Sequence, residues 1–299
     1  MNLTNLFDAA IETENVVYKN IRDLSKYADD KAYAENLWKN FKPLADKEFL
    51  AEFSRDFHAR YWEMYLANAL LDAGHTLGAS KKNHGPDLYI KQDEEKIWIE
   101  AVIAKKGDGD DAPEAVEAGM KEIAPGFRIG SVKALSDEPL ILRYTTAINY
   151  KFDKYNKYLA QNIISGNHPF IIALNGGEVP FDFVKDSVPR IVKALFALGQ
   201  EQCVLNTSTM EVIAASFQYK AAIVKKSGNE VETDIFLNNK HEGISAIIYD
   251  CENVCNRIAP LGSGFVVIHN PFAKNPLPRG FLKVGTEYWV EGDELKFSR

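Results

Sequence analysis

The sequence has few cysteines and no long apolar run. Its three cysteines, Cys203, Cys251 and Cys255, cannot all pair with one another, and no Cys/His spacing suggests zinc. This pattern indicates a reduced protein without a disulfide framework. No apolar stretch approaches the ~18 residues that would span a bilayer. Residues 1–15 contain no basic residue, which is the wrong charge for a secretory signal. We therefore expect a cytoplasmic protein that does not cross a membrane.

An excess of positive charge is also missing. The formal net charge is -7 at pH 7, from 35 Lys and Arg against 42 Asp and Glu. Nucleic-acid-binding domains often carry the opposite sign, but binding to phosphates depends on the local field. Much of the acidity lies within residues 108–117, and basic pairs such as Lys81-Lys82 occur elsewhere. The net charge therefore counts mildly against a nucleic-acid partner without excluding one.

What the sequence does contain is an alternation of helix-like and strand-like segments. Residues 1–46 are predicted to be an amphipathic N-terminal helical segment. A long helix is predicted from about Asp46 to Ala73, ended by Gly74. The alternation that follows predicts a mixed α/β sheet in a core of residues 47–205. Within that core we expect strands at 75–79, 87–90, 96–104, 140–143 and 169–174, helices at 145–164 and 188–198, and a loop at 107–130.

The remainder of the chain, residues 206–299, is β-rich. Strands are predicted near 221–224, 233–237, 244–249 and 264–269, followed by a last pair at 287–290 and 294–297. These strands form either a small appended domain or an extension of the same sheet, and the sequence leaves both arrangements open.

Two carboxylates fall on neighbouring predicted strands. Asp87 follows Gly85-Pro86 and opens one strand, and Glu100 lies inside the apolar run of the next. Adjacent strands can bring such carboxylates to one metal ion, and Mg²⁺ prefers oxygen ligands. A carboxylate in an apolar run is costly to bury unless something neutralises it. The pattern thus predicts a Mg²⁺ (or Mn²⁺) site; the alternative is that Glu100 faces solvent from an edge strand.

A third carboxylate, Glu63, lies in the predicted helix. Between Ala59 and Leu71 the only charged residues are Arg60 and Glu63, and large apolar side chains cover nearly the whole circumference of the helix. Glu63 therefore either forms an internal i,i+3 ion pair with Arg60 or enters the metal site.

These three carboxylates follow a known order. Glu63 lies on a helix, Asp87 opens a strand after Gly85-Pro86, and Glu100 lies on the following hydrophobic strand. This arrangement resembles the core of the PD-(D/E)XK, or restriction-endonuclease-like, nucleases. The resemblance covers roughly Phe53 to Asn175. It implies a restriction-endonuclease-like mixed sheet flanked by helices, with the β-rich region as a C-terminal extension. It also implies that Asp87 and Glu100 are metal ligands, that the Ala101 carbonyl is a further ligand, and that Glu63 is the helix-borne acid.

One position departs from the family pattern. The family's lysine, expected two residues after the Glu, is Val102 here. That lysine holds or activates the attacking water and offsets developing phosphate charge. Some members of the superfamily supply the cation from the neighbouring helix, where Lys151 is the first candidate and Lys154 the next. Lys105 is the third candidate.

Three basic residues are candidates for substrate binding: Lys154, named above, Arg143 and Lys82. Arg143, just before that helix, would contact a phosphate bidentately. Lys82, shortly before Asp87, would touch the phosphate backbone. For each of these cations, Lys151 and Arg143 included, the alternative is an ordinary solvated surface charge.

These residues together predict a Mg²⁺-dependent endonuclease that hydrolyses phosphodiester bonds in DNA, with RNA as the second choice. A homodimer is one way for such an enzyme to cut both strands. Val102 favours an alternative, a catalytically inactive protein of this fold that binds nucleic acid or protein. A second alternative is a glycoside hydrolase using Glu63 and Glu100, which would need those carboxylates roughly 5 to 9.5 Å apart and no divalent ion.

Overall fold

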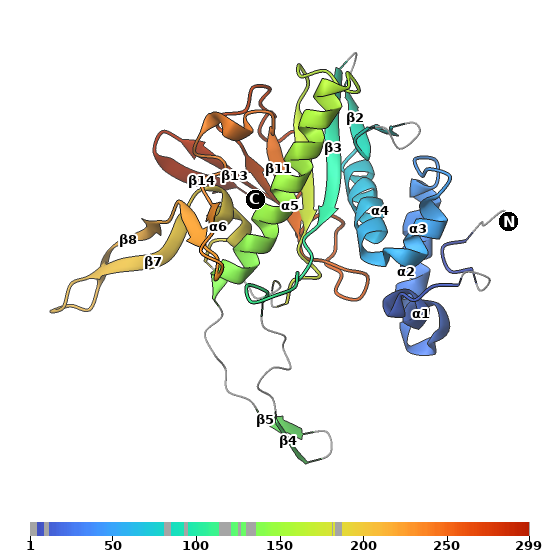
Figure 1. Ribbon diagram of the computed structural model, residues 1–299, viewed down its shortest axis with the longest axis horizontal. Coiled ribbons are helices and arrows are strands. Elements are labelled where there is room, and N and C mark those ends of the chain that lie inside the picture. The colour runs from blue at the N-terminus through green and yellow to red at the C-terminus, as the bar shows by residue number, and fades with distance from the viewer. Residues whose placement is uncertain are drawn as a thin grey trace.

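The fold is built around one central sheet. The computed structural model describes residues 5–8, 12–80, 85–92, 95–113, 121–124, 127–129, 136–180, 182 and 187–298. Eight strands form a mixed sheet in the order β1-β2-β3-β6-β11-β12-β13-β14, with helices on both faces (Figure 1). The expectation of a mixed α/β protein is confirmed.

The first half of the sheet contains the predicted carboxylates. Helix α4 (Phe57–Asp72) is followed by β1 (Leu77–Ala79), β2 (Leu88–Gln92) and β3 (Glu95–Ile103), which pair antiparallel in sequence order. Helix α5 (Asp137–Ala160) then crosses over to β6 (Phe170–Asn175), which pairs parallel to β3. Such a crossover is how two parallel neighbours are connected.

The alternation of side chains along β3 decides which helix each residue meets. Ile97, Ile99 and Ile103 belong to the apolar core on the α4 side. Trp98 and Val102 pack in the core on the α5 side. Because side chains of a strand alternate between the two faces, Glu100 points toward α5.

The β-rich part of the chain continues the same sheet. Strand β11 (Ala246–Asp250) pairs parallel to β6, and β12 (Val266–His269) pairs antiparallel to β11. Strand β13 (Thr286–Glu291) then pairs parallel to β12 and forms a hairpin with β14 (Glu294–Ser298). The strands from residue 246 onward therefore hydrogen-bond into the sheet that holds Glu100.

The remaining elements are peripheral. The N-terminal helices α1 (Val16–Asp23), α2 (Ala28–Phe41) and α3 (Phe49–Arg55) pack on α4 through aromatic residues such as Phe41, Phe49 and Phe53. Short helices η1 (Ser25–Tyr27), α6 (Arg190–Leu195) and η3 (Asn239–His241) complete the helical set of the described ranges. Three two-stranded sheets lie outside the main sheet: β4 (Lys121–Ala124) with β5 (Phe127–Ile129), β7 (Leu198–Leu205) with β8 (Val212–Tyr219), and β9 (Ala222–Val224) with β10 (Glu230–Glu232).

Several predicted elements differ from the structure. The long helix is two helices, interrupted at Asp56, whose backbone leaves the helical region (φ -118, ψ 64). The strand at 140–143 is wrong, because this apolar run is a buried turn of α5; a short apolar run has no period that separates strand from helix. The strand at 233–237 is also wrong, since β10 ends at Glu232. The β7–β8 hairpin was not predicted as such.

Within the described ranges, no helix combines the length and the apolar character needed to cross a bilayer.

Candidate active site

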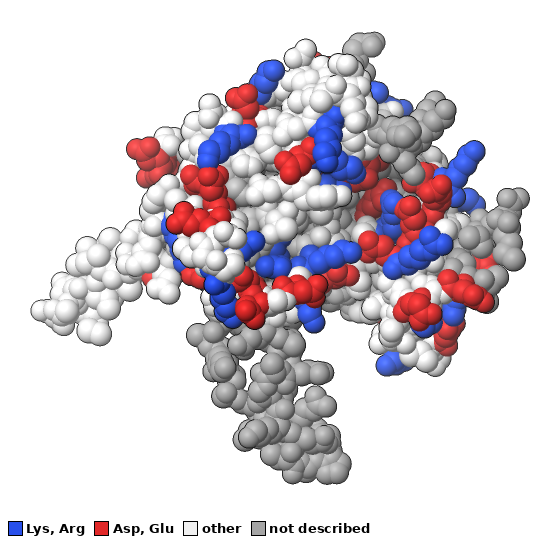
Figure 2. Space-filling view, in the orientation of Figure 1, with Lys and Arg blue, Asp and Glu red and all other residues white. Residues whose placement is uncertain are grey.

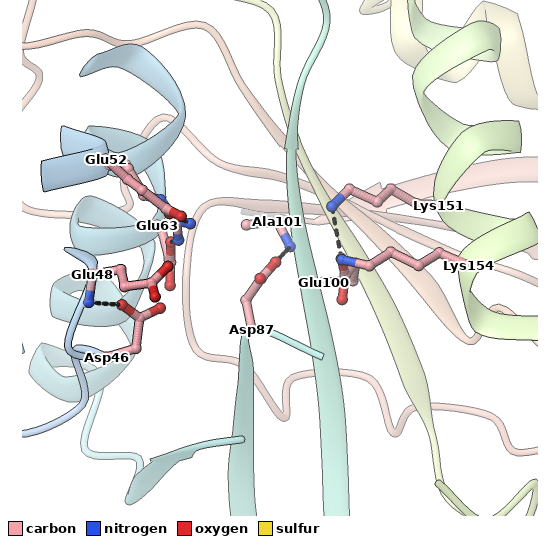
Figure 3. A network of polar contacts seen from close by, with 10 residues as sticks. Asp46, Glu48, Glu52, Glu63, Asp87, Glu100, Ala101, Lys151 and Lys154 are labelled. Carbon is pink, nitrogen blue, oxygen red and sulfur yellow. Dashed lines mark hydrogen bonds and ion pairs between the residues drawn. The ribbon is translucent and has the colours of Figure 1, made fainter. Parts of the chain in front are cut away.

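The centre of the site is Glu100, whose side chain is completely buried. Its Oε1 lies 2.7 Å from the Lys151 ammonium and 2.5 Å from the Lys154 ammonium, both from α5 (Figure 3). The Tyr158 hydroxyl lies 3.3 Å from the other oxygen, Oε2. These residues are three and four positions apart and so share one face of the helix. The alternative that Glu100 faces solvent from an edge strand is therefore wrong.

The two ammonium groups neutralise the buried carboxylate. Lys151 is itself buried, and the Lys154 side chain is 35% exposed. Burial acts to lower the pKa of the Lys154 ammonium, but the Glu100 carboxylate outweighs it and raises that pKa. Lys154 therefore stays charged beside Glu100. The compensation that a carboxylate in an apolar run requires comes here from side chains of α5.

Asp87 lies near Glu100 and its two lysines, one residue before β2. Backbone pairing of β2 with β3 ends at Leu88 opposite Ile99, and the Asp87 Oδ2 accepts the next free N–H, that of Ala101, at 2.8 Å. The N–H and C=O of one strand residue point to the same side in such a ladder, so the Ala101 carbonyl faces Asp87 too. Burial, and then the nearby Glu100 carboxylate, raise the pKa of Asp87.

Glu63 approaches from α4, on the other side of β3. It forms the i,i+3 ion pair, with Arg60 Nη1 2.6 Å from its Oε2, and Arg60 also pairs with Glu52. Burial, and then the Asp87 carboxylate, nonetheless raise the pKa of Glu63. Figure 3 shows Glu63 among Asp46, Glu48 and Glu52, on the side of Asp87 away from Glu100. Glu63 is thus near Asp87 but does not meet Glu100.

Of the other predicted basic residues, Arg143 and Lys105 form no ion pair with Glu100. Arg143 precedes Lys151 by two turns of α5, about 12 Å along the axis. Its guanidinium packs against Gly107, and its Nε is buried without a hydrogen-bond partner among the described residues. Lys105 is exposed and faces Asp56 at 3.7 Å. Lys82 lies outside the described residues.

Sequence reasoning missed Tyr158. Its hydroxyl donates a hydrogen bond to the Gly85 carbonyl at 3.0 Å and also reaches Glu100. It therefore ties the turn before Asp87 to α5. The signal was present in the sequence, because Tyr158 continues the helical face of Lys151 and Lys154 at i+7 and i+4.

The donor set suits a hard cation with few protein ligands. Across the described ranges, no group of three or more His, Cys, Asp or Glu side chains is arranged to hold a metal ion. The available oxygens are those of Asp87 and Glu100 and the Ala101 carbonyl, and Asp87 Oδ1 accepts no hydrogen bond from a described residue. Mg²⁺ commonly takes one or two carboxylates and completes its octahedron with water and phosphate oxygens. The residues therefore fit Mg²⁺ or Mn²⁺ in chemistry and number.

Comparison with known proteins identifies no relative. No protein-family model matches the chain, and no curated protein or solved structure is significantly similar to it.

Proposed function

We propose that this protein is a metal-dependent nuclease of the restriction-endonuclease-like type that hydrolyses phosphodiester bonds in DNA. The observation that carries the proposal is that Asp87, just before β2, contacts the Ala101 backbone of β3 beside Glu100, which faces two lysines of α5. The order α4-β1-β2-β3-α5-β6, with the β4–β5 hairpin inserted between β3 and α5, supports it, since the resemblance implies an acid-bearing helix, adjacent carboxylate strands and a cation from the next helix. The choice of DNA over RNA rests on the resemblance alone.

Each residue has a role in this proposal. Asp87, Glu100 and the Ala101 carbonyl would hold Mg²⁺ or Mn²⁺. Such an ion, when bound, polarises the scissile phosphate and lowers the pKa of water. Lys151 would neutralise charge that develops on the phosphate as the water oxygen bonds to phosphorus and the bond to the leaving oxygen breaks. Lys154 would then remain as the partner of Glu100, so that this buried carboxylate is never left uncompensated.

The charge distribution bears on how DNA would bind. On the face shown in Figure 2, Lys and Arg side chains are interspersed with Asp and Glu and form no continuous basic band. With a net charge of -7, the protein has no long-range attraction for a polyanion. Binding would therefore depend on local contacts at the site, and we expect it to weaken steeply with added salt.

One observation favours a second candidate, a catalytically inactive protein of the same fold that binds nucleic acid or protein. Val102 occupies the lysine position, and the ammonium groups of Lys151 and Lys154 both pair with Glu100. The glycoside hydrolase alternative gains no support, because Glu63 and Glu100 lie on opposite sides of β3 (Figure 3).

The decisive experiment is a cleavage assay on supercoiled plasmid, linear duplex and single-stranded DNA, with Mg²⁺, Mn²⁺ or EDTA. We expect metal-dependent cleavage that is lost in Glu100→Ala and kept in Glu294→Ala, a matched change on the exposed end of the sheet. Thermal unfolding of each variant checks that it is folded. Cleavage that survives in both Glu100→Ala and Asp87→Ala would overturn the mechanism. No cleavage by the folded wild-type chain, together with DNA binding, would favour the inactive binding protein.

A further inference from the structure

The β7–β8 hairpin, residues 198–219 and called the arm below, projects away from the body of the molecule (Figure 1). It is anchored only at its root, where Ala197 N donates to the Thr233 carbonyl and Lys220 N to the Ala197 carbonyl, both at 2.7 Å. From Gln202 to Phe217, the hydrogen bonds to other described residues run between the two strands or within their turn. A two-stranded hairpin without further support is marginally stable in water, so the arm requires a covering surface.

The arm exposes an unusual share of large apolar side chains. It carries six of the fourteen exposed large apolar residues in the part of the chain that the structure describes. These are Val204, Leu205, Met210, Val212, Ile213 and Tyr219. At these exposures they present on the order of 600 Å² of apolar surface, against the roughly 800 Å² per partner of a standard protein interface. The arm is therefore large enough to form most of one side of such an interface.

The charge of the arm excludes a nucleic acid as the partner that covers it. Residues 198–219 include no Lys or Arg, and their only charged residues are Glu201 and Glu211. The face of the arm visible in Figure 2 is almost entirely uncharged. A surface of this kind offers nothing to neutralise phosphates, whereas it matches the apolar centre of a protein–protein interface.

The outer edge of β8 indicates that the partner which covers the arm is a second copy of this chain. Free edge strands are normally protected by charged residues or proline, but β8, Val212–Tyr219, contains neither. Two copies of β8 paired antiparallel about a two-fold axis would satisfy each other's free N–H and C=O groups, and the surface would be self-complementary. The same pairing through β7 would bring two copies of Glu201 together, and like charges across a strand pair are destabilising.

We propose that the arm is a dimerisation element, in which β8 of one copy pairs antiparallel with β8 of a second copy to form a continuous four-stranded sheet. The apolar residues on the faces of the arm pack in the same interface. The inference concerns assembly and does not depend on the reaction that the Glu100 site performs.

The test is sedimentation velocity of the full chain between about 1 and 100 μM, with Val212→Lys and Val224→Lys as a matched pair. Both valines lie on strands of two-stranded sheets, at 60% and 62% exposure, but Val224 belongs to β9 and not to the arm. We expect a dimer for the wild type and for Val224→Lys, and at least a tenfold weaker dimer for Val212→Lys. Hydrogen exchange should show the amides of β8 slowed with increasing wild-type concentration and not in Val212→Lys.

Three outcomes would overturn the proposal. The first is a wild type that is monomeric throughout this range. The second is a dimer that Val212→Lys leaves unchanged, because the interface would then lie elsewhere. The third is a monomer that binds neutral phosphatidylcholine vesicles through the arm, which would assign the arm to a lipid surface. Since none of these measurements uses DNA cleavage, failure here is separable from failure of the proposed nuclease activity.

Discussion

The buried Glu100 and the buried pair of Asp250 and Glu252 differ in how their charge is compensated. At the proposed active site, Glu100 contacts the ammonium groups of Lys151 and Lys154. At the end of β11, Asp250 and Glu252 are as deeply buried but form no ion pair with any described residue. Their partners are neutral donors, such as the Tyr65 hydroxyl 2.7 Å from Glu252 Oε2 and the backbone N–H of Cys251 2.7 Å from Asp250 Oδ1.

The lack of a cationic partner favours protonation in the Asp250 region. Burial, and then the neighbouring Glu252, raise the pKa of Asp250 to about 7, and burial raises that of Glu252 as well. One oxygen of each is buried without a partner among the described residues. Asp250 can therefore escape the penalty of a buried charge by binding a proton. Glu100 has cations instead, and cations next to a carboxylate are what a site that handles phosphate and metal requires.

The largest expected effect is on the stability of Glu100→Gln. Removing this charge leaves the buried Lys151 ammonium facing a neutral amide, and an uncompensated buried charge typically costs about 3–5 kcal/mol of unfolding free energy. Urea unfolding at pH 8 should show that loss for Glu100→Gln and none for Asp250→Asn, which removes an unpaired buried charge. Adding Lys151→Met to Glu100→Gln should recover part of the loss. Equal losses in Glu100→Gln and Asp250→Asn would mean that the lysines do not distinguish the two regions.

The next effect concerns cleavage by lysine variants. If Lys151 stabilises charge on the phosphate, Lys151→Met should reduce kcat by about 10²–10³-fold, as is usual when one electrostatic donor is removed. Lys154→Met should have a smaller effect, because water screens its 35% exposed side chain. Lys157→Met is the control, since Lys157 is exposed on the same helix. A greater loss in Lys154→Met than in Lys151→Met would reverse the two assigned roles.

The Asp250 region should make stability depend on pH. The pKa of the Asp250 carboxyl is about 7 in the folded protein and roughly 3.9 in an unfolded chain. Between these two pH values the folded state therefore binds one more proton than the unfolded state. Stability from this group is therefore fully present below about pH 4 and is lost as pH rises toward 7, at up to about 1.4 kcal/mol per pH unit. Unfolding measured between pH 5 and 8 should show a shallower decline in Asp250→Asn. The exposed Asp293→Asn should keep the wild-type slope; an unchanged slope in Asp250→Asn would show that this carboxyl is not the group that titrates.

The contrast also shows what sequence alone could predict. Asp87 and Glu100 were found because each stands out from an apolar strand, and the period of α5 identified Lys151 and Lys154 as neighbours on one face. That both lysines bind a single oxygen of Glu100 could not be predicted, because it depends on how closely α5 packs on β3. The pairing of Glu63 with Arg60 stayed open for the same reason, since spacing permitted both arrangements.

The buried Asp250 and Glu252 gave no sequence signal. Asp250 ends β11 and Glu252 follows it in a polar stretch that is typical of a loop, and only the fold brings Tyr65 of α4 onto Glu252. The continuation of the sheet through β11 to β14 was likewise undecided, because β-rich segments pair equally well within a separate domain. Local patterns therefore predicted most strands of the main sheet, whereas long-range pairing decided their partners.

The smallest effect distinguishes positioning from charge at the Glu100 site. Tyr158 donates to the Gly85 carbonyl and so holds the turn that presents Asp87. Tyr158→Phe deletes that hydrogen bond and the longer one to Glu100 Oε2, but it leaves both lysines and both carboxylates in place. We expect a loss of about 1 kcal/mol in unfolding free energy, as for one hydrogen bond.

Cleavage should respond in a way that separates this role from catalysis. If Tyr158 only positions Asp87, Tyr158→Phe should lower kcat a few-fold and raise the Mg²⁺ concentration needed for half-maximal rate, without changing the pH profile. Tyr155→Phe is the matched control, because Tyr155 lies on the same helix and its hydroxyl makes no hydrogen bond to the described residues. A shifted pH profile in Tyr158→Phe would instead mean that the hydroxyl takes part in proton transfer. In that case the neutral hydroxyl beside Glu100 would take part in the reaction together with the two cations.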